Sequence, residues 1–499
     1  MFEEMRFGDT AGGAAGAAGE ELPTTPEGEL TGLVAALAAG RVSSRDLVAE
    51  SLDRIIATQP TLNAFRRVRH SAAMAEAAAA DRRLAAGERL PLLGVPLAIK
   101  DDMDLAGEPT AFGCSGAFPP AGADSEIVRR LRAAGAIIVG KTNTPEIGQW
   151  PFTEGKAFGA TRNPWNLDHT SGGSSGGSAS AVAAGLVPAA VGSDGAGSIR
   201  IPAAWTHLVG IKPQRGRIST APSPELFNGL TVYGPLARTV ADAALLLDVL
   251  AGPTARDRHR PRPAPGAYRD AARRTPGRLR IALSFKIPFS GLPAALDPGV
   301  KAAVRRLADV LTGLGHEIVE AEPRYGLMGL WFLPRSLAGV DAWRRGVPDE
   351  SLLDPRTLAN ARSGSWLRPL VPVAKVAERA QRLTVSSVFR RADVVLAPTT
   401  ALPPPRVGAM NRPSNARTDR EIVAACPYTW PWNVLGWPAV NVPAGFTDGG
   451  LPIGAQLMGR GGSEALLISL AAQLETVERW ASARPPAVGA GLAATGEGR

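Results

Sequence analysis

The 499-residue sequence predicts an α/β fold with parallel strands in its sheet. From Leu93 onward, short apolar runs alternate with amphipathic segments, which is the pattern of strand–helix–strand units. Such units place parallel strands in one sheet and join them by right-handed crossovers. Before this alternation, residues 30–88 carry apolar residues at helical spacing, and the alanine-rich stretch 72–86 strongly favours helix. We therefore predict N-terminal helices followed by an α/β core.

The other elements are predicted in order along the chain. Val95–Ile99 is a continuous apolar run of strand length. Asp124-Ser125 is a suitable cap for a helix through Ala134, which Gly135 ends. Short apolar runs predict strands at 136–139, 279–283, 317–320 and 393–397. Longer amphipathic segments predict helices at 239–250, 298–314 and 463–480, and residues 325–390 lean toward helix.

Composition marks the boundaries of the folded part. Residues 1–26 are rich in Gly, Ala, Glu, Thr and Pro, and we expect this segment and residues 486–499 to be disordered tails. Residues 253–277 are rich in Pro and Arg without an apolar period, which is typical of a basic linker. The predicted parts of the domain at 27–485 are helices (27–90), a core (91–252), this linker (253–277), a helix-leaning segment (278–392) and a return to the core sheet (393–485).

Charge and cysteine content exclude several classes of protein. The formal net charge is +9, but the arginines are spread along the chain rather than clustered with aromatics, so we expect no nucleic-acid partner. Two cysteines, Cys114 and Cys426, cannot form a disulfide framework and fit a reducing compartment. The acidic N-terminus does not resemble a signal peptide, and no apolar run is long enough for a membrane span. These features predict a cytoplasmic protein that does not bind membranes.

The stretch from Asn163 to Ser219 carries the candidate chemistry. It contains two Gly/Ser clusters, 172–178 and 192–198, where serine hydroxyls lie beside many backbone N–H donors, as acyl transfer requires. A flexible linker is disfavoured by the apolar residues between and after the clusters. A phosphate-binding loop is disfavoured because Ser178-Ala179 stands where Lys-Ser/Thr is needed. A G-x-S-x-G nucleophile elbow at 172–176, with Ser174 as nucleophile, remains open.

A histidine base for such an elbow finds little support. Of the histidines after Ser174, His207 lies in an apolar run, His259 in a basic string and His316 at a predicted turn. Lys100 is the alternative, because it ends the buried run 93–99 and burial lowers the pKa of a lysine toward that of a usable base. A plain ion pair of Lys100 with Asp101 or Asp102 is an equally good interpretation from these residues alone.

Several ordered motifs resemble those of the amidase signature family. The resemblance extends from about residue 30 to about residue 475 and rests on the segments GVPLAIKD (94–101), GKTN (140–143), GATRNPW (159–165), GGSSGGS (172–178), GSDGAGSIRIPA (192–203), NVLGWPA (433–439) and GLPIGAQ (450–456). It implies a mixed, largely parallel β-sheet sandwiched between helices. It also implies that residues 91–252 hold the catalytic core and that 278–392 face the substrate, with 325–390 as pocket candidates.

The resemblance implies a Ser-cisSer-Lys triad and no metal or cofactor. Ser198 would be the nucleophile, Ser174 the bridging serine on a cis peptide bond, and Lys100 the base, which makes Ser174 the relay rather than an elbow nucleophile. The backbone N–H groups of residues 195–198 would form the oxyanion hole, chiefly those of Gly195, Ala196 and Gly197. Supporting roles would fall to Ser175, which could orient Lys100, and to Asp194 and Arg200, which could hold the loop.

The expected activity is hydrolysis of a small-molecule carboxamide, with ester cleavage as an extension. The family commonly has Thr-Gly-Gly before the nucleophile, whereas this chain has Gly195-Ala196-Gly197, which leaves the substrate open. One alternative is the glutaminase A subunit of a tRNA-dependent amidotransferase, although such members tend to have Gln where this chain has Ile201. Another is a non-catalytic binding protein on the same fold. Family members are often dimers, so a homodimer is expected.

Overall fold

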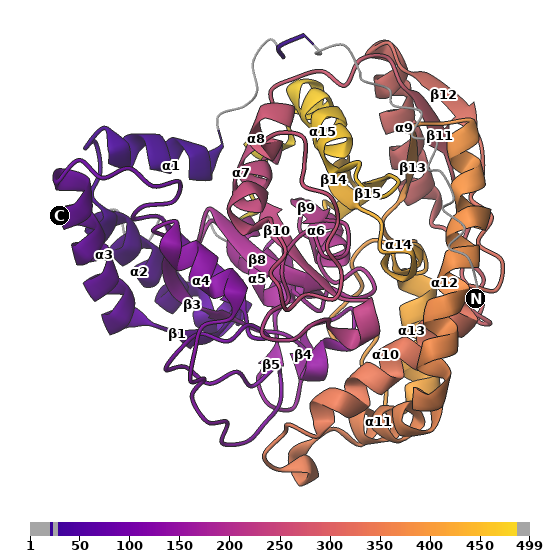
Figure 1. The fold of residues 1–499 in the computed structure, drawn as a ribbon, viewed down its shortest axis with the longest axis horizontal. Helices are drawn as coiled ribbons and strands as arrows, with labels where there is room; N and C mark the ends of the chain where they lie inside the picture. Colours follow the sequence, from indigo (N-terminus) through magenta and orange to yellow (C-terminus); the bar gives the residue numbers. More distant parts are fainter. Residues whose placement is uncertain (1–19, 23–27, 487–499) are drawn as a thin grey trace, which may run out of the picture.

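The computed structural model describes residues 20–22 and 28–486, and its centre is an eleven-stranded sheet. The sheet extends from β1 on the left to β12 at the upper right of Figure 1. In spatial order its strands are β1 (Phe65–Val68), β3 (Ile137–Thr142), β2 (Pro96–Lys100), β8 (Ala189–Asp194), β10 (Val232–Ala237), β9 (Val209–Lys212), β14 (Ala439–Phe446), β15 (Pro452–Met458), β13 (Val394–Pro398), β11 (Arg280–Leu283) and β12 (Glu317–Glu320).

The sheet is mixed, as predicted, and its parallel pairs lie toward its two ends. Strand β2 pairs in parallel with β3 and β8, and β11 does so with β12 and β13. The pairs between β8 and β13, and the edge pair β1–β3, are antiparallel. The description "largely parallel" therefore applies to these two blocks and not to the middle of the sheet.

Helices cover both faces, which confirms the predicted sandwich. Along β8, Ala189 and Val191 belong to one hydrophobic cluster while Ala190 belongs to another, because successive strand side chains point to opposite faces. The first face is covered by α1 (Glu29–Ala38), α4 (Glu126–Ala133), α7 (Val240–Leu250), α9 (Pro298–Gly313) and α15 (Glu464–Glu478). The second is covered by α2 (Ser44–Leu62), α3 (His70–Ala85), α5 (Gly176–Ala183) and α6 (Arg200–Trp205).

The predicted elements agree with these bounds to within a few residues. Helix α7 begins after Thr239, whose side chain accepts a hydrogen bond from the N–H of Asp242. Ser125 precedes α4 as predicted, but its hydroxyl donates to the carbonyl of Asp104 instead of capping the helix. The edge strand β1 was not expected, because it is a four-residue strand between two helices; it pairs with β3, and its Phe65 is buried.

The helix-leaning stretch forms three helices at the right and lower right of Figure 1: α10 (Gly329–Arg344), α11 (Pro355–Leu367) and α12 (Val371–Val385). Two short helices complete this region and its border with the sheet, α13 (Asn415–Ala425) and α14 (Trp430–Leu435). Short two-stranded pairs, β4–β5 (Glu154–Gly155, Gly159–Ala160) and β6–β7 (Arg162–Asn163, Asn166–Thr170), lie outside the main sheet.

The basic segment 253–277 is partly folded onto the domain. It contains α8 (Tyr268–Ala271), and Tyr268 is buried. Residues 20–22 also belong to the folded part, because Glu21 forms a β-bridge with Arg274 and Leu22 is buried, which corrects the expectation of disorder at these positions. The rest of the predicted tails, except residue 486 at the edge of the domain, lies outside the described residues.

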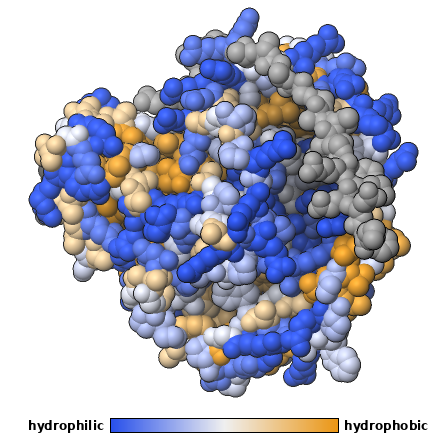
Figure 2. Space-filling view, in the orientation of Figure 1, coloured by the Kyte–Doolittle hydropathy of each residue, from blue (hydrophilic) through white to orange (hydrophobic). Residues whose placement is uncertain are grey.

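The visible face is mostly hydrophilic, with hydrophobic residues gathered over the N-terminal helices and at the right near α12 (Figure 2). Among the described residues, every helix is too short or too polar to cross a membrane.

Candidate active site

Lys100 lies at the carboxyl end of β2 and is fully buried. Its neighbour β8 runs parallel to it, with Ile99 opposite Val191, so Ser193 ends the adjacent strand on the same edge of the sheet. Lys100 Nζ is 2.7 Å from the Oγ of Ser174 and 2.7 Å from the Oγ of Ser193. The parallel pairing of two strands thus brings together residues that are far apart in the sequence.

Burial lowers the pKa of Lys100, while Asp102 opposes this shift. The Asp102 Oδ2 is 3.4 Å from the ammonium nitrogen. Ser193 also joins the two groups, because its hydroxyl donates to Asp102 Oδ2 at 2.5 Å. Lys100 is therefore both a partner of Asp102 and a candidate base. Desolvation has a larger effect on its pKa than Asp102 has.

Ser174 contacts Lys100 from a loop that precedes α5, and the Gly173–Ser174 peptide bond is cis, as the resemblance implied. Gly173 is packed so closely that a Cβ there would lie 2.6 Å from the backbone nitrogen of Phe152. Only glycine fits this position. The Gly/Ser cluster at 172–178 is therefore a packed part of the core rather than a linker.

Ser198 is half-buried and precedes α6. Its carbonyl accepts a hydrogen bond from the N–H of Ser175 at 3.1 Å. Its hydroxyl makes no hydrogen bond to another side chain in the described part of the chain, and it lines the same cavity as Lys100 and Ser174. Lys100 thus forms a hydrogen bond with Ser174 in this structure, whereas no hydrogen bond joins Ser174 to Ser198.

The resemblance implied that Ser175 could orient Lys100, but no hydrogen bond joins these two residues in the structure. The Ser175 hydroxyl donates to the carbonyl of Ser193 at 3.1 Å and accepts from the N–H of Ser193 at 3.2 Å. Ser175 therefore fixes the backbone of Ser193, and it can affect Lys100 only through that residue.

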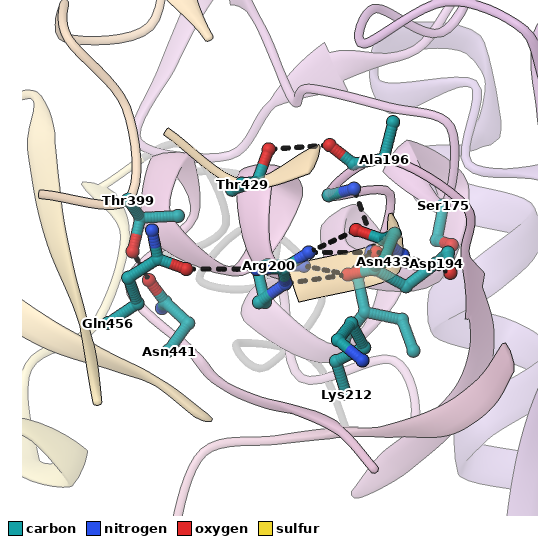
Figure 3. Close-up of polar contacts among 12 residues, drawn as sticks. Ser175, Asp194, Ala196, Arg200, Lys212, Thr399, Thr429, Asn433, Asn441 and Gln456 are labelled. Atoms are coloured by element: carbon teal, nitrogen blue, oxygen red, sulfur yellow. Dashed lines mark hydrogen bonds and ion pairs between the residues drawn. The ribbon is translucent and has the colours of Figure 1, made fainter. Parts of the chain in front are cut away.

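Asp194 and Arg200 form a buried ion pair that holds the loop between β8 and α6 (Figure 3). Arg200 donates from Nε to Asp194 Oδ2 at 3.0 Å and from Nη2 to Oδ1 at 3.1 Å. Although burial alone would raise the pKa of Asp194, Arg200 and other partners hold it at about 2. Asn433 of α14 completes the cluster by donating to the Asp194 side chain and accepting from Arg200. The predicted loop-holding role fits these contacts.

The same loop supplies the candidate oxyanion donors. The N–H of Gly197 donates to Asp194 Oδ1 at 2.7 Å, so it is already paired, and the prediction that Gly197 is an oxyanion donor is wrong for this conformation. The N–H groups of Gly195, Ala196 and Ser198 have no protein acceptor among the described residues. The carbonyl of Ala196 accepts from the hydroxyl of Thr429, which fixes the peptide that follows Ala196 (Figure 3).

Sequence reasoning missed several residues of this cluster. Ser193 lies inside one of the family motifs, but no role was predicted for it, and Asp102 was considered only as an ion-pair partner. Asn433 and Thr429 come from α14 and its flank, more than 200 residues after the loop that they hold. The only local signal for a role of Ser193 was its position next to the loop that carries the proposed nucleophile. The contacts of α14 depend on the tertiary fold and have no local signal.

A cavity of about 460 Å³ opens over these residues. Lys100, Ser174, Ser193 and Ser198 lie in its wall, with Gly195 and Ala196 beside them. Most of the remaining wall is apolar and comes from α10, from the loop at 289–292 and from the region of α13 and α14; it includes Phe112, Trp150, Ile201, Phe227, Leu330, Phe332, Leu333, Trp343 and Trp430. The pocket prediction for 325–390 thus fits α10, while α11 contributes Asn360.

Such a cavity suits an apolar ligand whose polar group meets the lysine–serine cluster. Among other candidates for the pocket from the sequence, Trp150 lines the cavity, whereas Cys114, Phe152 and Phe158 lie outside the lining. No group of three His, Cys, Asp or Glu residues that could hold a metal ion occurs within residues 20–22 and 28–486.

Comparison with known proteins gives a consistent picture. The family model described as Amidase matches residues 46–342 and 347–468. A protein of Mycobacterium tuberculosis (strain ATCC 25618 / H37Rv) named "Putative amidase AmiA2" is 58% identical over 480 residues, which cover 96% of this chain and 98% of that protein. The A subunit of a glutamyl-tRNA(Gln) amidotransferase from Synechococcus sp. (strain CC9605) is 38% identical over 485 residues, covering 90% of this chain and 96% of that one.

A solved structure of 6-aminohexanoate cyclic dimer hydrolase complexed with substrate has the same fold. It superposes with a TM-score of 0.84 at 30% identity and covers 92% of this chain and 98% of its own.

Proposed function

The chain belongs to the amidase signature family and is an amide hydrolase, and we propose that it acts through an acyl-enzyme on Ser198. The observation that carries this proposal is the contact of a fully buried lysine with Ser174 at 2.7 Å, in one cavity with Ser198. A buried lysine with a lowered pKa can be neutral and accept a proton near neutral pH. Lys100 is therefore the base and Ser174 the relay.

Acylation begins when Ser174 gives its proton to Lys100 and takes the proton of Ser198. This relay requires the Ser198 hydroxyl to turn toward Ser174. The Ser198 Oγ then attacks the amide carbon, and the carbonyl π electrons move onto the oxygen. The N–H groups of Gly195, Ala196 and Ser198 are the available donors for this oxyanion, and a single such donor contributes about 3 kcal/mol to stabilisation of the transition state.

The tetrahedral intermediate collapses by breaking the C–N bond, and the amine leaves with the proton returned through Ser174. A water molecule, deprotonated by the same relay, attacks the acyl ester. The second tetrahedral intermediate releases the carboxylic acid, and Ser198 regains its proton. Asp194 and Arg200 keep the donor loop in place throughout, and Ser193 with Asp102 holds Lys100.

The cavity wall supports an amide with a bulky apolar group. Aromatic and branched side chains dominate the lining, and Ile201 stands beside the nucleophile. This wall offers little to the polar side chain of glutamine, which disfavours the glutaminase alternative. The higher identity to the named amidase than to the amidotransferase protein is consistent with this ranking.

The test is covalent labelling with a fluorophosphonate probe, read by intact mass, on wild type and on Ser198→Ala. We expect one adduct on wild type, none on Ser198→Ala, and loss of hydrolysis of apolar amides in that variant. Ser386→Ala, which removes the hydroxyl of a half-buried serine outside the cavity lining, is the control and should label fully.

Labelling that persists in Ser198→Ala but vanishes in Ser174→Ala would overturn the assignment of the nucleophile and restore the elbow hypothesis. Release of ammonia from glutamine at a rate above that of every apolar amide tested would favour the amidotransferase function.

A further inference from the structure

A second cavity, of about 620 Å³, lies apart from the active site and shares no lining residue with it. Its walls come from several parts of the chain: residues 214–217 after β9, residues 258–268 of the basic segment, Arg382 of α12, the turns at 436–437 and 461–462, and Ala465 of α15. Its ionisable lining is cationic or neutral: Arg215, Arg217, Arg258, His259, Arg260, Arg262, Tyr268 and Arg382.

Carboxylates behind the wall neutralise only part of this charge. Glu378 serves three arginines at 2.7–2.9 Å, which are Arg215, Arg335 and Arg382. Glu225 is shared by Arg258, His259 and Lys375, and Glu464 pairs with Arg217. Six Lys and Arg side chains thus share three carboxylates, and Arg260 and Arg262 of the lining share none, which leaves an excess of about five positive charges in and behind the wall.

Arg260 and Arg262 contribute most clearly to this excess. Neither has a carboxylate within 4 Å among the described residues. Arg260 donates only to the backbone carbonyls of Asp257 and Ala255. Both side chains are exposed at the rim, so they are free to turn toward a ligand.

The inner part of the cavity is preorganised. Arg215 is 7% exposed, and its guanidinium is fixed by Glu378 and by the carbonyls of Asn433 and Val434. Its Nε, however, has no partner, and neither does the hydroxyl of Tyr268, which is 2% exposed. Both atoms are enclosed by the protein and do not open to the cavity, so the inner arginines act on a ligand through their fixed positive charge.

We propose that this cavity binds a small molecule with two or more phosphate groups. Guanidinium groups match phosphate oxygens in pairs of parallel hydrogen bonds, and the excess of charge suits a polyanion better than a single phosphate. The exposed Arg260 and Arg262 contact the ligand, and the charge of the inner arginines attracts its phosphates. Nothing in the amide hydrolysis described above uses this site.

The experiment is titration of the full chain with inorganic pyrophosphate in 150 mM salt, followed by calorimetry and by thermal unfolding. The test variant is Arg260→Ala/Arg262→Ala. The matched control is Arg269→Ala/Arg273→Ala, which removes two exposed arginines of the same segment outside the cavity. We expect one pyrophosphate per chain, affinity reduced at least tenfold in the test variant, and less than a twofold change in the control.

ADP is titrated in parallel to separate the two sources of such a ligand. If ADP binds more tightly, the ligand is a nucleoside diphosphate. If pyrophosphate binds more tightly, the ligand is an inorganic polyphosphate. Either outcome supports the proposed site. Absence of binding at 1 mM of both probes would overturn the proposal. An equal loss of affinity in both double variants would also overturn it, because it would show attraction to net charge alone.

Discussion

A single buried lysine illustrates how the site is built at the scale of residues. Lys100 is desolvated by its position at the end of a fully buried strand, which lowers its pKa, and Asp102 limits the shift. Ser193 stands between them at hydrogen-bonding distance from both. The pKa of Lys100 is therefore set by a balance between burial and two carboxylates, of which Asp102 has the larger effect and Asp194 the smaller.

Removing the charge of Asp102 tests this balance. Asp102→Asn should lower the pKa of Lys100 further, because the carboxylate favours the charged amine. Activity requires the neutral amine, so the acidic limb of the pH profile of kcat/KM should move to lower pH by about one unit, the low end of the effect of a nearby opposite charge. The plateau should fall about tenfold, since a hydrogen bond to a charged group contributes about 1.5 kcal/mol.

Asp104→Asn is the control, because it removes a carboxylate two residues away that makes no contact with Lys100. An unchanged acidic limb in Asp102→Asn, or a shift to higher pH, would contradict the role of Asp102.

At the scale of elements, the close contact of α10 with α11 shapes the substrate cavity. A Cβ at Gly364 of α11 would lie 1.9 Å from the carbonyl oxygen of Leu337 in α10, so the helices touch through this glycine. Helix α10 carries a large share of the apolar cavity wall, including Leu330 and Leu333. The shape of the cavity therefore depends on a contact outside its lining.

Gly364→Ala should push α11 away from α10. We expect a loss of about 1–3 kcal/mol of unfolding free energy, which is typical of overpacking, and a higher KM for apolar amides. Gly313→Ala is the matched control: this helical glycine at the end of α9 has open space around its Cβ position. The control should be neutral or stabilised by about 0.5 kcal/mol, because alanine restricts the unfolded chain.

Urea unfolding and Michaelis–Menten kinetics measure both effects. A KM in Gly364→Ala equal to that of wild type would show that the cavity does not depend on this contact.

Local pattern predicted the elements with a long apolar or amphipathic run, such as β2, α7 and α9. It missed β1 and the short pairs β4–β5 and β6–β7, because these strands are mostly polar or only two residues long and carry no continuous apolar run. At the site, the resemblance named Lys100, Ser174 and Ser198, which the fold brings to one cavity. The pairing of Gly197 with Asp194 and the contacts of Asn433 could not be predicted, since they depend on the turn geometry and on packing of distant segments.

At the scale of the whole molecule, two buried carboxylates connect three helices on one face of the sheet. Asp242 of α7 accepts hydrogen bonds from the N–H groups of Leu30 and Thr31 in α1. Glu475 of α15 accepts from the N–H of Val240 at the start of α7. Burial raises the pKa of Asp242 to about 6 and, with the nearby charge of Asp242, that of Glu475 to about 8.

These shifts predict a stability that depends on pH in a stated direction. Glu475 holds its proton in the folded state up to about pH 8, whereas the unfolded chain releases it near its ordinary value of 4.5. Unfolding therefore releases a proton between these values, and the unfolding free energy falls as pH rises through that window. Burial lowers the pKa of Lys212 to about 7, which makes stability rise with pH above that value, so the difference between wild type and a Glu475 variant reports on Glu475 rather than the wild-type slope.

Glu475→Gln keeps an acceptor for the N–H of Val240 but has no proton to lose. From pH 6 to pH 8, wild type should lose about 2–3 kcal/mol of unfolding free energy relative to Glu475→Gln, since one pKa unit corresponds to about 1.4 kcal/mol. The variant should therefore be the more stable protein at pH 8.5. Urea unfolding at several pH values, with the exposed Glu320→Gln as control, measures the difference. Parallel curves for wild type and Glu475→Gln would mean that the carboxylate is already ionised in the folded protein at pH 6, and that the contact between α7 and α15 tolerates its charge.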